Sequence, residues 1–321
     1  MQRYLMRRIV QMIPLVFLIT ILSFTIMHVA PGDPLDIMMD PLHRSPEEIA
    51  LAAKRLGLDQ PIHVQYFRWL RELSAGNLGY SYLSGRPVRD LILERLPSTL
   101  LLTVTALTLT FALAVPIGVI SAVKRYSVLD RVVTVISFGG ISVPEFFLCL
   151  ALLYVVSLRL KLLPTSGFET LGVELSGLQL WADRARHLVM PAIAMAIPSI
   201  AGIARYTRSS MIDVLGEDYI RTGRAKGLRE RAVILRHALK NSLMPVITLF
   251  GMEFPALFGG AFVVEWIFDW PGMGTLAVKA ASNREYSILM ALNLVTSFLV
   301  LLGNLIADIL YAVVDPRIRY E

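Results

Sequence analysis

The sequence has one cysteine, Cys149, among its 321 residues. A lone cysteine cannot form an internal disulfide, and this one lies in the middle of an apolar segment, where it is expected to be a small buried residue. Disulfides within the chain are therefore excluded as a source of stability, and the cysteine content says nothing about the redox compartment.

Signatures of enzymatic chemistry are also lacking. The dipeptide Gly-Lys does not occur, so the chain has no phosphate-binding loop of the Gly-x-x-x-x-Gly-Lys-Ser/Thr type. No nucleophile elbow and no paired-carboxylate signature is present. The five histidines show no metal-ligand spacing: His28, His43, His63, His187 and His237. We therefore expect no enzyme activity, cofactor or metal in this chain.

Charge is scarce as well. Charged residues make up 17% of the chain and hydrophobic residues 55%, and the mean hydropathy is +0.61. These values lie beyond those of a soluble domain. A membrane-spanning helix needs ~20 mostly apolar residues, and six segments reach or approach that length: 9–30, 98–123, 132–158, 188–206, 243–266 and 286–314. The sequence predicts an all-α polytopic membrane protein with six transmembrane helices.

The first apolar segment follows a positively charged start, as the apolar run of a signal peptide does. It is too long for a signal peptide, however, and His28-Val29-Ala30 lacks the small residue that cleavage prefers at position −3. We therefore expect a retained first helix that begins in the cytoplasm.

The distribution of basic residues favours one orientation in the membrane. With both termini in the cytoplasm, the inner pieces 1–8, 124–131, 205–242 and 315–321 hold 17 Lys or Arg against 7 acidic residues. The outer pieces hold 14 basic and 14 acidic residues, and eight of the basic ones lie in 31–97, which exceeds the ~60 residues within which the positive-inside rule applies. The inverted orientation would place the large basic cluster of 205–242 outside, so we expect both termini in the cytoplasm.

Segment 31–97 is expected to form a small helical extracytoplasmic insertion after the first helix. Ser45-Pro46-Glu47-Glu48 has the N-cap, N1 and N3 residues typical of a helix start, and Gly57 suits the end of that helix. A second short helix is expected over 61–74. The segment is too small for a core of its own, and two roles stay open: a lid packed on the helices, or part of a docking surface.

Interruptions of the helix are considered in three of the predicted spans. The third span contains Gly139-Gly140 and Pro144, and the fourth is short and is expected to be interrupted at Pro191 and Pro198. The fifth contains Pro255. Broken helices in a membrane protein can line a cavity, so these spans are compatible with a transport path.

Four acidic residues lie in or near the spans, where ionisable groups are costly and usually face the bundle interior, a partner or a watery path. Glu145 and Glu265 can lie near helix ends and simply reach water. Glu253 is nearer the middle of its span, and for Asp308 an interhelix hydrogen bond is favoured over substrate contact. All four are candidate pathway residues.

A basic stretch, 217–227, lies between two apolar segments. Gly216 and Gly227 can break a helix, which predicts a short helix, a joint and a second amphipathic helix. Apolar residues recur at steps of three and four and are expected to form one helix face: Ala225, Leu228, Ala232, Leu235 and Leu239. The alternative is a basic loop that only sets the orientation of the chain.

The order of residues in this stretch resembles the coupling loop, or EAA loop, of membrane subunits of binding-protein-dependent ABC importers. Within that family it resembles the dipeptide, oligopeptide and nickel branch more closely. The likeness covers nearly the whole chain. Importers of this branch have two non-identical permeases, and the chain resembles the first of them, the dipeptide permease B type. The matching strings are Pro31-Gly32-Asp33-Pro34, Gly76-Asn77-Leu78-Gly79-Tyr80-Ser81, Arg95-Leu96-Pro97-Ser98-Thr99-Leu100, residues 216–228, Trp270-Pro271-Gly272-Met273-Gly274 and Asp315-Pro316-Arg317-Ile318.

The sequence departs from the pattern of that branch at a few positions. Gly223 stands where alanine is expected, which would loosen a helix by ~1 kcal/mol. Eighteen positions separate Gly227 from Pro245, so only the first half of the general loop pattern carries over. The string 283–287 lacks an expected Asp-Tyr-Pro.

The resemblance implies a type I ABC importer permease fold in the bacterial inner membrane. It implies as partners a second homologous permease, two cytoplasmic ATPases that bind ATP and magnesium, and an extracytoplasmic binding protein, with no nucleic acid. Relatives carry di- and oligopeptides, nickel chelates, glutathione or some oligosaccharides. The chain would divide into 1–30, the insertion 31–97, a permease core 98–314 with its coupling loop at about 207–242, and a cytoplasmic tail 315–321.

The resemblance also implies which residues couple this chain to the ATPases. Asp218 is expected to cap the short helix, Arg221, Arg224 and Lys226 to meet carboxylates of the ATPase, and Gly227 to supply the joint. The full set of expected coupling residues is Glu217, Asp218, Tyr219, Arg221, Thr222, Gly223, Arg224, Lys226 and Gly227.

Two other functions stay open at this point. An ion-coupled secondary transporter would use a carboxylate at Glu253 or Asp308, and it should show an internal repeat. The large loop 31–97 has no counterpart in the second half of the chain, which disfavours that reading. A scaffold subunit without a transport path would not need interrupted spans with buried acids.

Overall fold

The computed structural model describes residues 2–29, 54, 59–253 and 261–314. Its regular secondary structure there is helical, apart from one isolated antiparallel bridge between Tyr80 and Pro87. The helix expected after Ser45 and the breaker Pro255 lie outside the described residues. The helix expected over 61–74 is present as α4.

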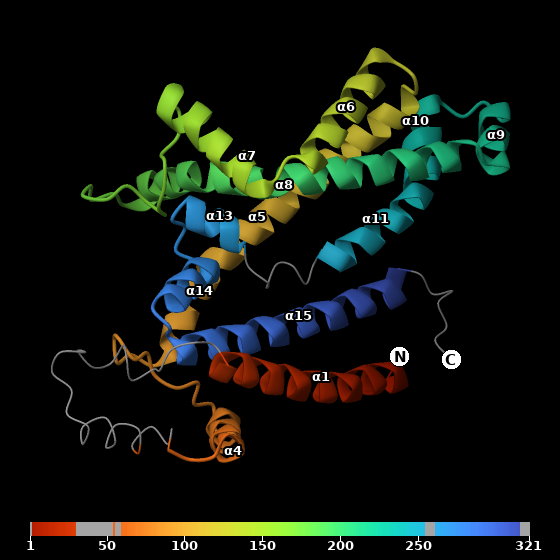
Figure 1. Cartoon of the computed structure of the whole chain (residues 1–321). Helices are drawn as coiled ribbons and strands as arrows, with labels where there is room; N and C mark the ends of the chain where they lie inside the picture. The colour runs from red at the N-terminus through yellow and green to blue at the C-terminus, as the bar shows by residue number, and fades with distance from the viewer. Residues whose placement is uncertain (1, 30–53, 55–58, 254–260, 315–321) are drawn as a thin grey trace.

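The described helices follow one another along the chain in this order: α1 Gln2–Val29, α4 Ile62–Ser74, α5 Val88–Val123, α6 Val128–Ser142, α7 Glu145–Leu152, the π-helix η1 Leu153–Arg159, α8 Gly177–Leu215, α9 Asp218–Ala225, α10 Glu230–Ala232, the π-helix η2 Val233–Ala238, α11 Leu239–Glu253, α13 Phe262–Ile267, α14 Met273–Ser282 and α15 Tyr286–Val314. Figure 1 shows α8 as the longest axis of the molecule, with α6 and α7 rising from it in a V. Helices α1 and α15 lie side by side.

Three helices of the described part are long and apolar enough to cross a membrane: α5, α8 and the 286–309 part of α15. Helices α6 and α7–η1 make a fourth span if the pair crosses as one unit, with a bend of 106° between them. The apolar part of α1 is shorter, and the predicted fifth span runs through residues outside the described part. The structure is thus that of a multi-spanning helical protein, and the count of six spans stays a prediction.

Two of the expected helix breaks are wrong. Helix α8 continues through Pro191 and Pro198 and is 39 residues long, so the fourth span is neither short nor interrupted. A proline removes one backbone hydrogen bond, and packed neighbours can accommodate that loss in a spanning helix. Helix α6 also runs through Gly139-Gly140, whereas the break expected at Pro144 is confirmed, since α6 ends at Ser142 and α7 begins at Glu145.

Glycine at position 140 serves close packing rather than a break. A Cβ atom there would lie 3.3 Å from Cβ of Ala201 on α8. Helix α5 approaches α8 more closely still, because a Cβ on Gly118 would lie 2.6 Å from both the Ala204 carbonyl oxygen and Thr207 Cβ. Small residues at such crossings let helix backbones approach each other in a membrane, so α5, α6 and α8 form a tightly packed group.

The described part of segment 31–97 is fastened to the helices at two points. Tyr66 and Trp69 of α4 contact Phe24 of α1, with ring centroids 5.3 and 5.9 Å apart, and the Tyr66 hydroxyl lies 2.9 Å from Thr20 Oγ1. The loop after α4 is held by Glu285, the residue before α15. This packing agrees with the first of the two roles left open for the segment, a lid packed on the helices.

The close crossing of α5 and α8 makes Gly118 a sensitive position. We expect Gly118→Ala to lower the thermal midpoint of the detergent-solubilised protein, because overpacking costs ~1–3 kcal/mol. Gly139→Ala is the matched control, since a Cβ there meets nothing within 4 Å and alanine favours a helix. A midpoint that falls equally for both variants would contradict the role assigned to Gly118.

Candidate functional site

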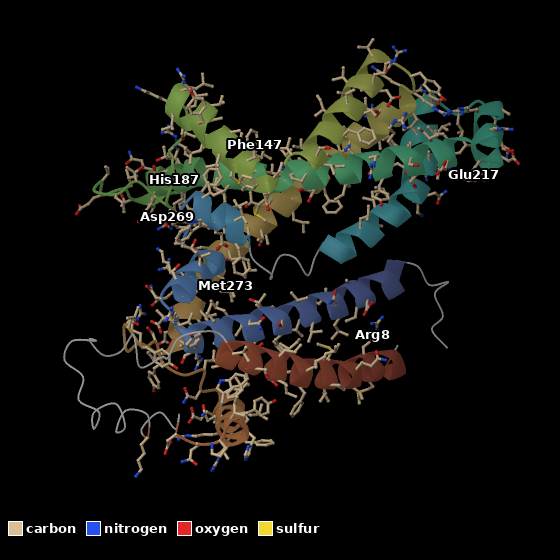
Figure 2. The ribbon with its side chains drawn as sticks, viewed as in Figure 1. Arg8, Phe147, His187, Glu217, Asp269 and Met273 are labelled. Atoms are coloured by element: carbon tan, nitrogen blue, oxygen red, sulfur yellow. The ribbon has the colours of Figure 1, made fainter. Side chains whose placement is uncertain are left out.

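Helix α9 lies at one end of the molecule, past the end of α8 (Figure 1). Glu217 occupies its N-cap position and is drawn at this end in Figure 2. No side chain caps the helix. The Asp218 side chain is 97% exposed and lies 3.7 Å from Arg221, so the expectation that Asp218 caps α9 is wrong. The predicted sequence of short helix, joint and second helix is confirmed.

One apolar side chain anchors α9 to the rest of the chain. Ile220 is 1% exposed and packs in a buried cluster with residues from α5, α8 and η2: Ala122, Met211, Val233 and Ala238. A displaced α9 would therefore push directly on α5 and α8. We call Ile220 with these four residues the Ile220 seat.

The apolar face expected along this stretch is not the one that the structure buries. Leu228 and Leu235 are 44% and 49% exposed, whereas Ile220, Val233 and Ala238 are buried. The joint separates the two helices, and residues 233–238 are π-helical. A π-helix bonds i to i+5 and shifts the positions that share a face, so a 3.6-residue period does not carry through the joint.

Gly227 makes the joint because it adopts a left-handed backbone conformation, with φ of +78°. Such a conformation is accessible to glycine and costly for most side chains. The surroundings of Gly227 are open, since a Cβ there would meet nothing within 4 Å. Gly223 differs, because it is helical and a Cβ there would make an ordinary 3.5 Å contact with Leu228. Alanine would thus fit at position 223. Packing does not require glycine in place of the alanine that the family pattern has there.

Two polar contacts brace α9 from within the chain. Asn241 Nδ2 of α11 donates to the Tyr219 hydroxyl at 2.7 Å. Arg224 donates from Nε and Nη2 to the two carboxylate oxygens of Glu230, at 3.2 and 2.7 Å, and so bridges the joint. These hydrogen bonds lower the pKa of Glu230. Arg224, expected to meet a partner's carboxylate, is thus engaged within its own chain.

The other expected coupling residues lie on the outside of α9. They are exposed: Glu217, Asp218, Arg221, Thr222 and Lys226. We call these five residues the outward set, and we call Tyr219, Gly223, Arg224 and Gly227 the inner set, because their contacts and backbone shape the helix although Tyr219 and Arg224 are themselves partly exposed.

The candidate pathway residue Asp308 forms an ion pair between helices. Arg8 of α1 lies with Nε 3.2 Å from Oδ2 of Asp308 on α15, which confirms the expected interhelix hydrogen bond. Figure 2 shows Arg8 between α1 and α15. A cavity of about 300 Å³ opens beside this pair, lined also by Gln11, Gly251 and Asn304.

Glu265 is fully buried, so the alternative that it lies near a helix end and reaches water does not hold. Its carboxylate accepts hydrogen bonds from Thr99 Oγ1 at 2.7 Å, Gly274 N at 2.6 Å and Thr275 N at 3.2 Å. A helix N-terminus offers such unsatisfied N–H groups to a carboxylate. A Cβ on Gly272 would lie 2.3 Å from the Glu265 carboxyl, so the carboxylate fills space that only glycine leaves open.

The same network explains two of the strings that carry the resemblance. Trp270 Nε1 donates to the Ser98 carbonyl oxygen at 2.9 Å, and Met273 N donates to Thr99 Oγ1 at 2.8 Å. The strings 95–100 and 270–274 therefore meet in space, with Glu265 between them. Sequence periodicity contains no signal of this contact, because it joins segments far apart along the chain.

The last two pathway candidates lie elsewhere. Glu145 is the first residue of α7, directly after the 106° bend, and its side chain is exposed. Glu253 is the last residue of α11, and its side chain lies outside the described part. Glu145, Glu265 and Asp308 thus belong to three different places: the bend, the α5–α13–α14 network and the α1–α15 pair.

Two buried carboxylates escaped the sequence analysis. Asp130 is 3% and Glu285 4% exposed. Glu285 accepts from Ser81 Oγ at 2.7 Å, Tyr82 N at 2.7 Å and Leu83 N at 3.1 Å. For Asp130 a signal was available, since Ser127 is the N-cap of α6 and accepts from Asp130 N, a pattern typical of helix starts. That pattern does not reveal burial.

Long apolar helices, a sharply bent helix pair and a short helix seated on the bundle define a multi-spanning helical membrane protein. The solved structures agree on the fold: the chain resembles the inward-facing MetNI methionine ABC transporter with a TM-score of 0.56, at 16% identity, over 71% of this chain and 97% of that chain. The chain belongs to the family of binding-protein-dependent transport system inner membrane components, whose model matches residues 114–320. The N-terminal model of the same kind matches residues 1–103.

Curated relatives match over the full length of both chains. The oligopeptide transport system permease protein AppB of Bacillus subtilis (strain 168) is 47% identical over 321 residues. The glutathione transport system permease protein GsiC of Salmonella paratyphi A is 38% identical over 321 residues. This chain is the permease subunit of an ABC importer, and the ion-coupled alternative finds no support.

Gly227 offers a test of the joint that separates backbone strain from bulk. We expect Gly227→Val to abolish uptake, leave membrane insertion intact and uncouple ATP hydrolysis from the loaded binding protein, because a β-branched residue resists φ above zero. Gly227→Asn should be mild, since asparagine tolerates this conformation. Arg224→Ala should also be mild, because exposed ion pairs are worth ~0–1 kcal/mol. Normal uptake by Gly227→Val in reconstituted vesicles would refute the role of the joint.

Glu265 should matter for stability. Glu265→Gln places an amide against the two N–H donors of α14, and hydrogen bonds to a charged group contribute ~1.5–3 kcal/mol. We expect a lower thermal midpoint of the purified protein. Glu94→Gln is the control: Glu94 is an exposed residue of α5 that pairs with Arg86, and its loss should change little. An unchanged midpoint for Glu265→Gln would show that the network is dispensable.

Proposed function

We propose that this chain forms, with a second homologous permease, the translocation pathway of an importer for peptides or similar small solutes. An extracytoplasmic binding protein delivers the solute, and two cytoplasmic ATPases, which bind ATP and magnesium, drive the cycle. The proposal for the cargo is supported by the relatives named for oligopeptide and glutathione transport. The proposal for coupling rests on the geometry of α9.

The single observation that carries the coupling role is the two-sided construction of α9. Ile220 is buried in its seat, and five polar side chains face outward from the same short helix. A helix with this construction can lie in a groove on a partner and transmit rigid-body motion to the helices that hold its buried side. The outward set would contact the ATPase, and the inner set would keep the helix in shape.

The motion would travel from α9 through the Ile220 seat to α5 and α8. Ala122 lies in the last turn of α5 and Met211 belongs to the last turns of α8, so closure of the ATPase pair would shift both helices together. Because α5 and α8 cross without a gap at Gly118, their displacement is shared along the bundle. Outward opening of the pathway follows as the two permeases rearrange.

Reconstitution tests this function. Purified alone, the chain should hydrolyse no ATP; with its partner permease, ATPases and binding protein in vesicles, it should take up labelled peptide only when ATP is supplied. Mass spectrometry of the ligand held by the co-purified binding protein would identify the cargo among peptides, glutathione, nickel chelates and oligosaccharides. Uptake driven by an ion gradient without the ATPases would refute the proposal.

The orientation proposed here places both termini and α9 in the cytoplasm of a bacterium, with residues 31–97 outside. Cys149 is the native cysteine and is buried, so Cys149→Ala gives a background for labelling. We expect Ser84→Cys to react with an impermeant maleimide from outside intact cells and Lys226→Cys only after the inner membrane is permeabilised. Both positions are exposed. The reverse labelling pattern would contradict this topology.

A further inference from the structure

The buried carboxylate of Asp130 gathers hydrogen-bond donors from three parts of the chain. Arg208 of α8 donates from Nε to Oδ1 at 2.6 Å and from Nη2 to Oδ2 at 2.9 Å. Ser121 near the end of α5 donates its hydroxyl, and Tyr126 of the connecting loop donates its N–H at 2.9 Å. The bidentate pair fixes α6 against α8 in distance and in rotation.

This pair lies beside the Ile220 seat. Ser121 is the neighbour of Ala122, and Arg208 precedes Met211 by one helical turn on α8. Ala122 and Met211 are two of the residues that pack on Ile220 of α9. The point at which α9 pushes on the bundle is therefore the point at which α6 is fastened to α5 and α8.

Stability alone is a weak reason for such a pair. Replacing a buried ion pair by apolar residues is often neutral or stabilising, because the desolvation of two charges offsets their attraction. What a bidentate contact contributes is a single defined geometry. Farther along α6, the Gly140 contact with Ala201 is apolar, and such a contact permits sliding and rotation that a bidentate contact does not.

We propose that Asp130 and Arg208 are positioning residues that make α6 move as one body with α9 and α8 when the ATPases act on α9. The inference rests on the coupling role proposed for α9 and goes beyond it, because none of the apolar residues described in the cluster around Ile220 belongs to α6. Without the pair, α9 would still bind the ATPase and shift α8, while α6 would lag, and with it the bend that begins at Val143.

Function in the assembled importer gives the first test. In vesicles, Asp130→Asn and Arg208→Gln should each reduce binding-protein-stimulated uptake by about tenfold, within the range that mutations in a coupling network produce. Basal ATP hydrolysis and the concentration of binding protein at half-maximal uptake should stay unchanged. Arg208→Lys keeps the charge without the bidentate contact and should lose less. If the Asp130→Asn protein fails to assemble, the comparison of Arg208→Lys with Arg208→Gln provides the test.

A matched control lies on the same helix. Arg184 of α8 also makes a two-donor contact with a carboxylate, that of Glu169, at 2.9 and 3.0 Å, but far from α9 along α8. Arg184→Gln should leave uptake at the wild-type level. Equal losses in Arg184→Gln and Arg208→Gln, or parallel losses of uptake and basal hydrolysis in Arg208→Gln, would overturn the proposal in favour of a general effect on stability.

A distance measurement separates this inference from the function on which it rests. Spin labels at Ala225 and Val135, both exposed, report α9 against α6, and labels at Ala225 and Ile306 report α9 against α15. Upon addition of ATP and magnesium to the complete importer, the second distance should shift while the first stays constant. In Arg208→Gln the first distance should shift as well.

Each outcome is decisive. No shift of the 225–306 distance in the wild-type importer would refute the coupling role of α9, and this inference with it. A shift of the 225–306 distance together with a shift of the 225–135 distance in the wild type would overturn the inference alone. So would a constant 225–135 distance in Arg208→Gln.

Discussion

The close contact between α5 and α8 is the constraint on which the other elements depend. At Gly118 the two backbones approach so closely that a single added methyl group would collide with the Ala204 carbonyl and with Thr207. Lipid tails are as apolar as side chains, so helices in a bilayer associate through packing and polar contacts and not through the hydrophobic effect. Helices α5 and α8 therefore form the axis, to which α6 is attached by a small-residue crossing and by Asp130, and α13 and α14 are attached through Glu265.

Three buried carboxylates make polar attachments of this kind, and each joins segments far apart in sequence. Asp130 joins the start of α6 to α5 and α8, Glu265 joins α13 and the start of α14 to α5, and Glu285 joins the loop after α4 to the start of α15. A buried carboxylate is costly unless donors surround it. These carboxylates contribute a defined geometry, because the fixed donors around each one hold a helix end at one position and in one rotation.

Helix α9 is a short helix that is held to its own chain on one side and has exposed polar residues as well. It has eight residues, too few for independent helical stability in water, and it is ordered by one buried isoleucine, one tyrosine contact and one ion pair across the Gly227 joint. Holding the helix through these contacts leaves other polar side chains of α9 exposed, as the proposed contact with an ATPase requires. The same construction explains why charge alone does not identify the residues that would couple: Arg224 is basic and pairs with Glu230 of its own chain, whereas Arg221 and Lys226 are basic and exposed.

The sequence by itself determined the class of protein, the short helix followed by a glycine joint, and the family, because apolar length, glycine position and ordered local strings are all encoded over short stretches. It predicted the Arg8–Asp308 type of contact only as a preference for an interhelix hydrogen bond. It was wrong about Pro191 and Pro198, because neighbours decide whether a proline interrupts a helix, and about the buried face after Gly227, because a π-helix shifts the period. Only the tertiary structure decided that Glu265 links α13 and α14 to α5 and that Asp130 links α6 to α5 and α8. Burial and hydrogen-bond donors from distant segments exist only once the chain has folded.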